Sequence, residues 1–208
     1  MLNFNPYLKQ TNMKKKAIFQ VLTILLFLAS CNPSPTNQPT LNDYKIGEKW
    51  TWKWESSVDG EVRGEGEDIR EVVDYNGVLG LWNGFDTLQI SEVLNKEKSS
   101  SPFRDWPLEV GKKWKYESEW TNESGEKGIT SQDVEIISFE ELQVVAGTFM
   151  TYKIKYDGFI ENYKAGGKGK VTDVFWYCPE LKTNVKHVQQ GGNGFLYTSE
   201  LIGYTSAE

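Results

Sequence analysis

Three tryptophans alternate with polar residues in one stretch of this chain, and this pattern constrains the fold more than any other feature. Trp50, Trp52 and Trp54 are separated by Thr51 and Lys53. Successive side chains of a β-strand point to opposite faces of a sheet. The stretch therefore predicts a strand with three indoles on one face and polar groups on the other.

The same kind of strand is predicted again further along the chain. Trp114, Tyr116 and Trp120 share one face of residues 112–121, and Ser118 interrupts them. We expect an internal repeat with halves at about 44–94 and 108–156; a chance recurrence of aromatic-rich strands is the alternative. The pairs that match at an offset of 64 are Gly47/Gly111, Trp50/Trp114, Phe85/Phe149, Thr87/Thr151 and Ile90/Ile154.

Short strand patterns separated by turn residues fill the chain from Leu41 onward, and no helix is predicted. Asp-Gly at 59–60 and Asn-Gly at 76–77 are hairpin signals, and residues 85–94 are expected to form a strand. Further strands are expected within 171–204. This spacing predicts a single all-β domain over residues 41–208, built as a curved antiparallel sheet, an open barrel or a sandwich.

The amino-terminal stretch has the pattern of an export signal. Lys14, Lys15 and Lys16 precede the apolar residues 17–28, a run too short for a lasting membrane span. We expect residues 1–30 to be a signal peptide, with Met13 as the more natural start.

The run ends in Leu28, Ala29, Ser30 and Cys31, which resembles the lipobox of bacterial lipoproteins. The resemblance implies that Cys31 carries a diacylglyceryl group, that the chain is cut before it, and that the new amino terminus is acylated. Two or more acyl chains anchor a protein stably to a membrane. An ordinary secretory signal followed by an unrelated cysteine is the alternative.

Residues 31–40 are polar and contain Pro33, Pro35 and Pro39, so we expect a flexible tether between anchor and domain. Asn32 follows the cysteine where an aspartate would retain an enterobacterial lipoprotein in the inner membrane. The expected location is therefore the cell envelope, at the outer membrane and facing the periplasm or the surface.

The charge of the chain argues against nucleic acid as a partner. Loss of residues 1–30 removes four lysines and no acids, which leaves 19 basic against 29 acidic residues. The net charge is then −10 in place of −6. An acidic domain of this kind is repelled by phosphate backbones.

No set of catalytic or metal-ligating residues stands out. His187 is the single histidine, which excludes a two-histidine metal site, and we interpret it as a half-exposed strand residue. Cys178 is interpreted as a buried structural cysteine with no disulfide partner if Cys31 is acylated. We expect no metal and no cofactor, and a hydrolase using Cys178 or a carboxylate pair is the least favoured reading.

The aromatic residues are the remaining candidates for function. Large rings between layers of a β domain supply burial energy, but indoles keep a polar N–H that suits a cavity wall. Packed core and ligand lining both stay open. The candidate ligand-contacting residues are Trp50, Trp52, Trp54, Trp114 and Trp120.

Short motifs in the second half of the chain resemble a family of bacterial lipoproteins with a DUF3108-like pattern. They are Pro107-Leu-Glu-Val-Gly-Lys-Lys-Trp114, Val145-Ala-Gly-Thr-Phe149 and Phe175-Trp-Tyr-Cys-Pro-Glu180. The resemblance covers about residues 107–188 and implies an all-β envelope protein. It implies no activity and no catalytic residues.

These patterns together predict a membrane-anchored envelope lipoprotein that acts as a non-enzymatic binding or structural module. An apolar or glycan ligand and an envelope protein are the expected kinds of partner. The alternative is a lipid or lipoprotein carrier with an aromatic-lined cavity in a half-barrel.

Overall fold

The computed structural model of the chain describes residues 34–96, 99–122, 124–164 and 166–207. The signal peptide expected for residues 1–30 and the lipid-attachment residue Cys31 lie outside these residues. The described elements belong to one compact unit, Asn32–Glu208. Within the described part of the chain, no helix is long and apolar enough to cross a membrane.

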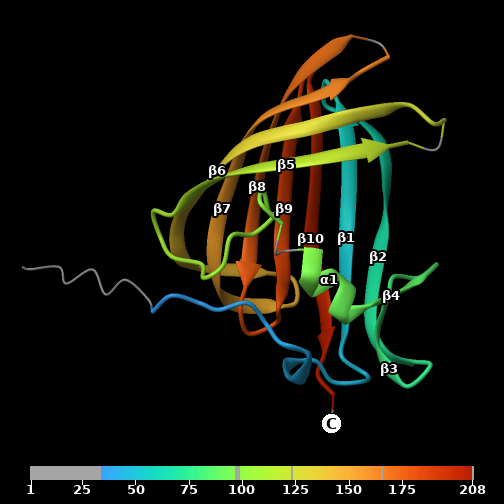
Figure 1. The fold of residues 1–208 in the computed structure, drawn as a ribbon, viewed down its shortest axis with the longest axis vertical. Coiled ribbons are helices and arrows are strands. Elements are labelled where there is room, and N and C mark those ends of the chain that lie inside the picture. Colours follow the sequence, from blue (N-terminus) through green and yellow to red (C-terminus); the bar gives the residue numbers. More distant parts are fainter. Residues whose placement is uncertain (1–33, 97–98, 123, 165, 208) are drawn as a thin grey trace, which may run out of the picture. The chain divides into compact units, whose positions relative to one another are not determined.

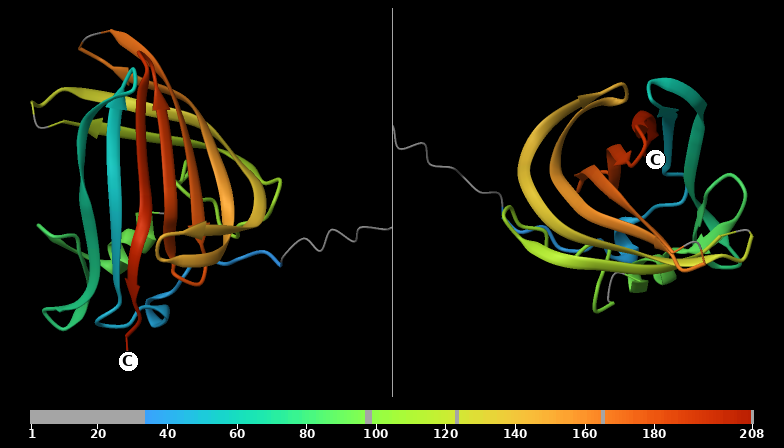
Figure 2. Two further views of the ribbon diagram at one scale, coloured as in Figure 1. Left: turned by 180° about the vertical axis from the view of Figure 1, so that it is seen from behind. Right: turned by 90° about the horizontal axis from the view of Figure 1, so that it is seen from above.

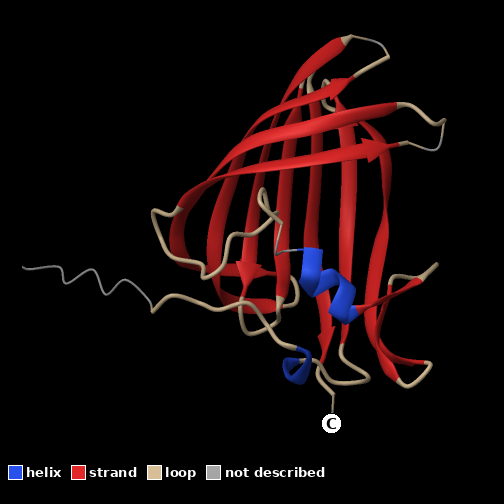
Figure 3. Ribbon diagram, viewed as in Figure 1, coloured by secondary structure: helices blue, strands red, loops and turns tan. Residues whose placement is uncertain are grey.

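The described chain forms one ten-stranded sheet in which every strand pair is antiparallel (Figures 1 and 3). The all-β prediction is confirmed. The order of strands is β4-β3-β2-β1-β10-β9-β8-β7-β6-β5, so the first strand lies beside the last. The strands are β1 (Lys49–Val58), β2 (Glu61–Tyr75), β3 (Val78–Trp82), β4 (Thr87–Gln89), β5 (Lys113–Thr121), β6 (Lys127–Val144), β7 (Gly147–Asn162), β8 (Gly167–Cys178), β9 (Thr183–Gly191) and β10 (Phe195–Thr205).

The sheet is curved and open, with β4 and β5 as its two edges (Figure 2). Over the described residues it neither closes into a barrel nor divides into two packed sheets. Of the three architectures that the sequence allows, the curved antiparallel sheet is the one observed. Its inner face, the one that carries Trp50 and Phe175, is covered in part by the helix α1 (Ile90–Lys96) and by residues 99–112.

Two apolar cores form where these segments pack on the sheet. In the first, Ile90 of α1 is buried with Trp50 and Leu201. In the second, Leu108 is buried with Tyr152, and Phe103 packs at the edge of this cluster. The helix α1 and residues 99–112 thus cover part of the inner face that the sheet alone would leave open to water.

The two aromatic strands, β1 and β5, begin in the same way. The N–H of Gly47 donates to Val72 at 2.8 Å, and the N–H of Gly111 donates to Ile136 at the same distance. Both glycines have a positive φ, +94° and +88°, which a side chain would strain. The correspondence is local to these two strand entries.

The predicted internal repeat is not shown by the structure. Residues 85–94, expected as a strand, form the short β4 and then the helix α1. Ile90 therefore begins a helix, whereas Ile154, its expected counterpart, lies in the sixteen-residue strand β7. The prediction of no helix was wrong because Ile90, Val93 and Leu94 follow a helical spacing within a segment that starts as a strand.

The segment expected as a flexible tether lies against the domain from residue 34 onward. Thr36 and Leu108 exchange two backbone hydrogen bonds, of 2.9 and 2.8 Å, and form an isolated bridge. Gln38 donates from its side chain to the Leu94 carbonyl at 2.7 Å. The segment has nothing apolar to bury, as expected, but it supplies partners for backbone groups of the loop and of α1.

Candidate ligand-binding cleft

Two cavities adjoin on the inner face, and together they are called the cleft. The first has a volume of about 390 Å³ and the second about 370 Å³. Four residues line both of them, so the cavities lie side by side: Arg70, Phe175, Thr183 and Asn184. The cleft lies in the range of volumes at which small-molecule sites occur in proteins.

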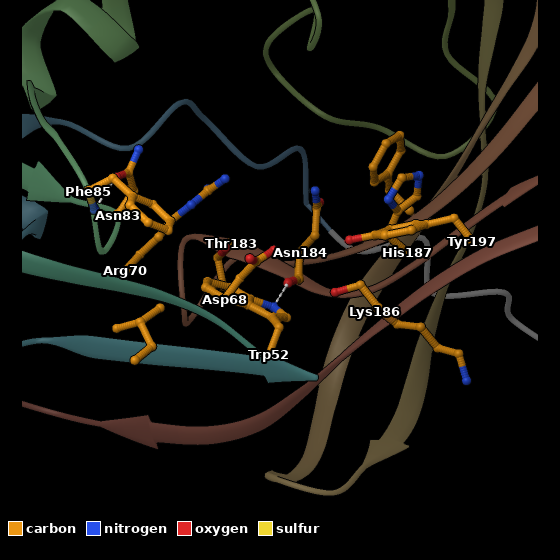
Figure 4. Close-up of a pocket in the computed structure, with 13 residues that line it drawn as sticks. Trp52, Asp68, Arg70, Asn83, Phe85, Thr183, Asn184, Lys186, His187 and Tyr197 are labelled. Carbon is orange, nitrogen blue, oxygen red and sulfur yellow. Dashed lines mark hydrogen bonds between the residues drawn. The ribbon is translucent and has the colours of Figure 1, made fainter. Parts of the chain in front are cut away.

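Strand register brings one wall of the cleft together. Trp50 of β1 lies opposite Arg70 of β2, and Trp52 lies opposite Asp68. Directly opposed residues of antiparallel strands point to the same face. In this wall, the indoles of β1 therefore lie beside the charged side chains of β2. Figure 4 shows Arg70 and Asp68 beside Trp52, with His187 and Tyr197 on the other side of the cleft.

The guanidinium of Arg70 lies over the ring of Trp52, with Cζ 5.5 Å from the ring centroid. Arg70 stays accessible to solvent but lies within the cleft. Partial burial in the cleft lowers the pKa of Arg70, the charge of Arg104 lowers this pKa further, and the charge of Asp68 raises it. The cleft therefore holds two neighbouring guanidinium groups.

Asn184 joins the two walls. Its backbone carbonyl accepts a hydrogen bond of 2.8 Å from the indole N–H of Trp52, drawn as a dashed line in Figure 4. Its side-chain oxygen accepts a bond of 2.7 Å from Arg104. The guanidinium of Arg104 also lies 4.5 Å from the ring centroid of Tyr177. These contacts fix the position of Arg104 at the cleft.

A buried polar network lies beside the cleft. The carboxylate of Asp173 accepts hydrogen bonds from Gln132 at 2.7 Å and from Gln189 at 2.9 Å. The Nε2 atom of His187 lies 2.8 Å from the same carboxylate, and the imidazole stacks on Phe175 with centroids 4.0 Å apart. The network holds His187 and Phe175 in one orientation at the cleft wall.

The structure distributes the five candidate tryptophans among different environments. Trp52 lines the first cavity and Trp50 the second, yet both are almost fully buried, at 7% and 2% exposure. Trp114 donates its indole N–H to the Pro102 carbonyl and lines a separate cavity. Two of the five candidates therefore meet at the cleft.

Trp54 and Trp120 line none of the cavities found in the described residues. Each lies across glycine on the neighbouring strand, Trp54 over Gly64 and Gly66 and Trp120 over Gly128. A large ring in these positions covers backbone that a glycine leaves bare. Their contacts are those of packing residues.

The residues that sequence reasoning missed are the polar ones of the cleft. Arg70 lies in β2, between the turns predicted at 59–60 and 76–77, but nothing in the pattern marks it out from the other charged residues of that strand. Arg104 lies in the connection after α1, and Asn184 lies at the start of β9. None of the three belongs to a motif that the sequence reveals.

Cys178 and His187, the two candidates for nucleophilic chemistry, both have structural contacts in the fold. Cys178 is fully buried, and removal from water raises the pKa of its thiol. The prediction of a buried structural cysteine is confirmed. His187 lies in strand β9 and is partly exposed, as interpreted, and its side chain is 2.8 Å from the buried carboxylate of Asp173. Among the described residues, no three His, Cys, Asp or Glu side chains form a group able to hold a metal ion.

No protein-family model and no curated protein matches the chain. The DUF3108-like resemblance thus remains a likeness of short motifs.

Three solved structures are similar to the chain. One is described as an exported protein with a YmcC-like fold from Bacteroides fragilis, at 12% identity and a TM-score of 0.37. One is described as a lipoprotein from Parabacteroides distasonis, at 14% identity and a TM-score of 0.45, and each of these covers 83% of this chain and 100% of its own. The hypothetical lipoprotein YmcC of Escherichia coli has 8% identity and a TM-score of 0.38, over 76% of this chain and 85% of its own. At these identities and TM-scores, no property of those proteins is carried over to this chain.

Proposed function

We propose that this chain is a lipid-anchored, non-enzymatic binding protein of the bacterial cell envelope, which holds a small ligand in the cleft on the inner face of its sheet. The observation that carries the proposal is the cleft itself. Its walls combine aromatic rings with accessible polar groups, and Arg70 and Asn184 line both of its cavities. Apolar walls with a few fixed polar groups are typical of ligand sites.

The anchor rests on the sequence. The lipobox-like residues before Cys31 support attachment of acyl chains to this cysteine, and Asn32 supports a place at the outer membrane. A tether that binds the domain at Thr36 leaves only a few residues between anchor and fold.

A binding role is favoured over catalysis by the state of the candidate catalytic groups. Cys178 is buried without access to the cleft lining, and His187 is committed to Asp173. The charge of −10 calculated for the chain without its signal peptide supports a ligand other than nucleic acid.

A carrier for lipids is the second candidate, and the second cavity favours it. Leu81, Val93 and Leu94 form an apolar side of that cavity. A carrier would release its ligand to another envelope protein, whereas a simple binding module would not need to.

Native mass spectrometry of the chain from Asn32 to Glu208, purified gently from a bacterial host, tests the proposal. We expect a bound mass that leaves on denaturation. A matched variant, Thr183→Trp, places an indole where both cavities meet and should lose the bound mass while keeping the fold. An apo mass for the unaltered chain, under conditions that preserve other complexes, would refute the binding role and leave the structural one.

A further inference from the structure

The lining of the second cavity carries charge of one sign only. Arg70, Arg104 and Lys182 line it, and no aspartate or glutamate is among its lining residues. The chain as a whole has 29 acidic residues against 23 basic ones, so this cavity departs from the composition of the protein. The first cavity, by contrast, has Asp68 in its wall.

The three cations differ in how far the protein neutralises them. Lys182 forms a buried ion pair of 2.7 Å with Glu48. Arg104 is held by Asn184 and by the ring of Tyr177. Among the described residues, Arg70 makes no ion pair within 4.0 Å, and its nearest aromatic partner is the ring of Trp52. Arg70 is thus the cation that a ligand can engage.

Two indoles border the second cavity, but their N–H groups are not turned toward it. The indole N–H groups of Trp50 and Trp106 are buried and have no hydrogen-bond partner among the described residues, and both residues line the second cavity. An acidic group in the cavity would relieve the repulsion between the guanidinium groups of Arg70 and Arg104.

We infer that the second cavity binds the acidic group of an anionic amphiphile, a carboxylate or a phosphate, with Arg70 as its charged contact. Leu81, Val93 and Leu94 receive the apolar part of the same molecule. The inference rests on the proposed function, since it names the class of ligand that the cleft takes. Charge-assisted hydrogen bonds from guanidinium to carboxylate or phosphate are among the strongest in proteins.

Isothermal titration calorimetry on the chain from Asn32 to Glu208 tests the inference. The probes are dodecanoate, dodecyl phosphate and the uncharged dodecyl maltoside, each below its micelle concentration. We expect an anionic probe to bind at least about tenfold more tightly than the maltoside, a difference of about 1.4 kcal/mol. Comparison of dodecanoate with dodecyl phosphate decides between a carboxylate and a phosphate source.

Arg70→Gln should weaken binding of the preferred anionic probe about tenfold or more and should leave that of the maltoside unchanged. Arg70→Lys should lie in between because it keeps the charge and loses the planar fork. Arg63→Gln is the matched control: Arg63 lies on the same strand, 58% exposed and paired with Glu61, and its loss should change nothing. Unfolding curves of the variants should coincide with that of the unaltered chain, which separates lost binding from lost fold.

Equal affinities for the anionic and uncharged probes would overturn the inference, as would full binding by Arg70→Gln or no binding of any probe. The proposed function is judged separately by the bound mass of the protein from its host. A mass that belongs to an uncharged molecule would keep the binding role and exclude the anionic subsite.

Discussion

Asp173 is the residue on which the polar contacts of the inner face converge. It is 5% exposed and accepts hydrogen bonds from Gln132 and Gln189, with His187 as a third neighbour. Asp173→Ala leaves these groups buried without their acceptor. We expect the free energy of unfolding to fall by about 2–4 kcal/mol, measured by urea denaturation.

The control for this prediction is Asp133→Ala, an exposed carboxylate next to Gln132 in sequence, which should change stability by less than about 0.5 kcal/mol. Equal small effects of the two substitutions would show that the network does not hold the inner face together.

Cys178 should be inert toward thiol reagents in the folded protein. It is fully buried, and the raised pKa of its thiol keeps it protonated at neutral pH. We expect labelling of the chain from Asn32 to Glu208 only after unfolding in denaturant, followed by mass spectrometry. Rapid labelling of the native protein at pH 7 would contradict the buried position.

At the residue scale, the sequence predicted which side chains share one face of a strand better than it predicted what surrounds each side chain. The alternation of Trp50, Trp52 and Trp54 correctly places them on one side of β1, because the period of a strand is a local property. Whether an indole ends in a core or over a glycine depends on strands that are distant in sequence. Arg70 could not be recognised because its neighbour in the second cavity, Arg104, lies far from it in sequence.

At the element scale, the β5–β6 hairpin depends on a glycine. A Cβ at Gly128 would overlap the carbonyl oxygen of Glu161 and the ring of Trp120. Gly128→Ala should therefore lower the free energy of unfolding by about 2–3 kcal/mol and alter the Trp120 indole signal in NMR spectra. Gly169→Ala, where a Cβ meets nothing within 4 Å, should be close to neutral. A neutral Gly128→Ala would mean that the hairpin is looser than the structure shows.

The amino-terminal segment should stabilise the domain that it leads into. A chain that begins at Leu41 lacks the backbone pair between Thr36 and Leu108 and the bond from Gln38. We expect it to unfold with about 1–3 kcal/mol less free energy than a chain that begins at Ser34, measured by calorimetry. Identical melting curves would restore the interpretation of this segment as a free tether.

The helix α1 lies in a segment whose sequence fits both a strand and a helix. Leu88 and Ile90 alternate as in a strand, while Ile90 and Leu94 have the spacing of a helix. The core decides between them, since Ile90 is buried beside Trp50 when the chain turns into a helix. Proline-rich composition likewise predicted an extended segment before Leu41 but not its partner, because Leu108 lies more than sixty residues away.

At the scale of the whole molecule, the class of fold was predictable and the topology was not. Turn signals such as Asn76 and Gly77 predict hairpins between neighbouring strands. The pairing of β1 with β10, which joins the two ends of the domain, has no local signal. That pairing brings Trp52 and Tyr197 to the same cleft, so the site could not be assembled from sequence alone.

The central claim is that a ligand occupies the cleft rather than another aromatic surface, and the indole N–H signals of the tryptophans test it most directly. We would titrate the isotope-labelled chain from Asn32 to Glu208 with dodecyl phosphate and assign each indole by Trp→Phe variants. The account predicts shifts at Trp50, Trp52 and Trp106, which line the cleft, and none at Trp54 or Trp120. Shifts confined to Trp54 and Trp120, or no shifts at all, would contradict it.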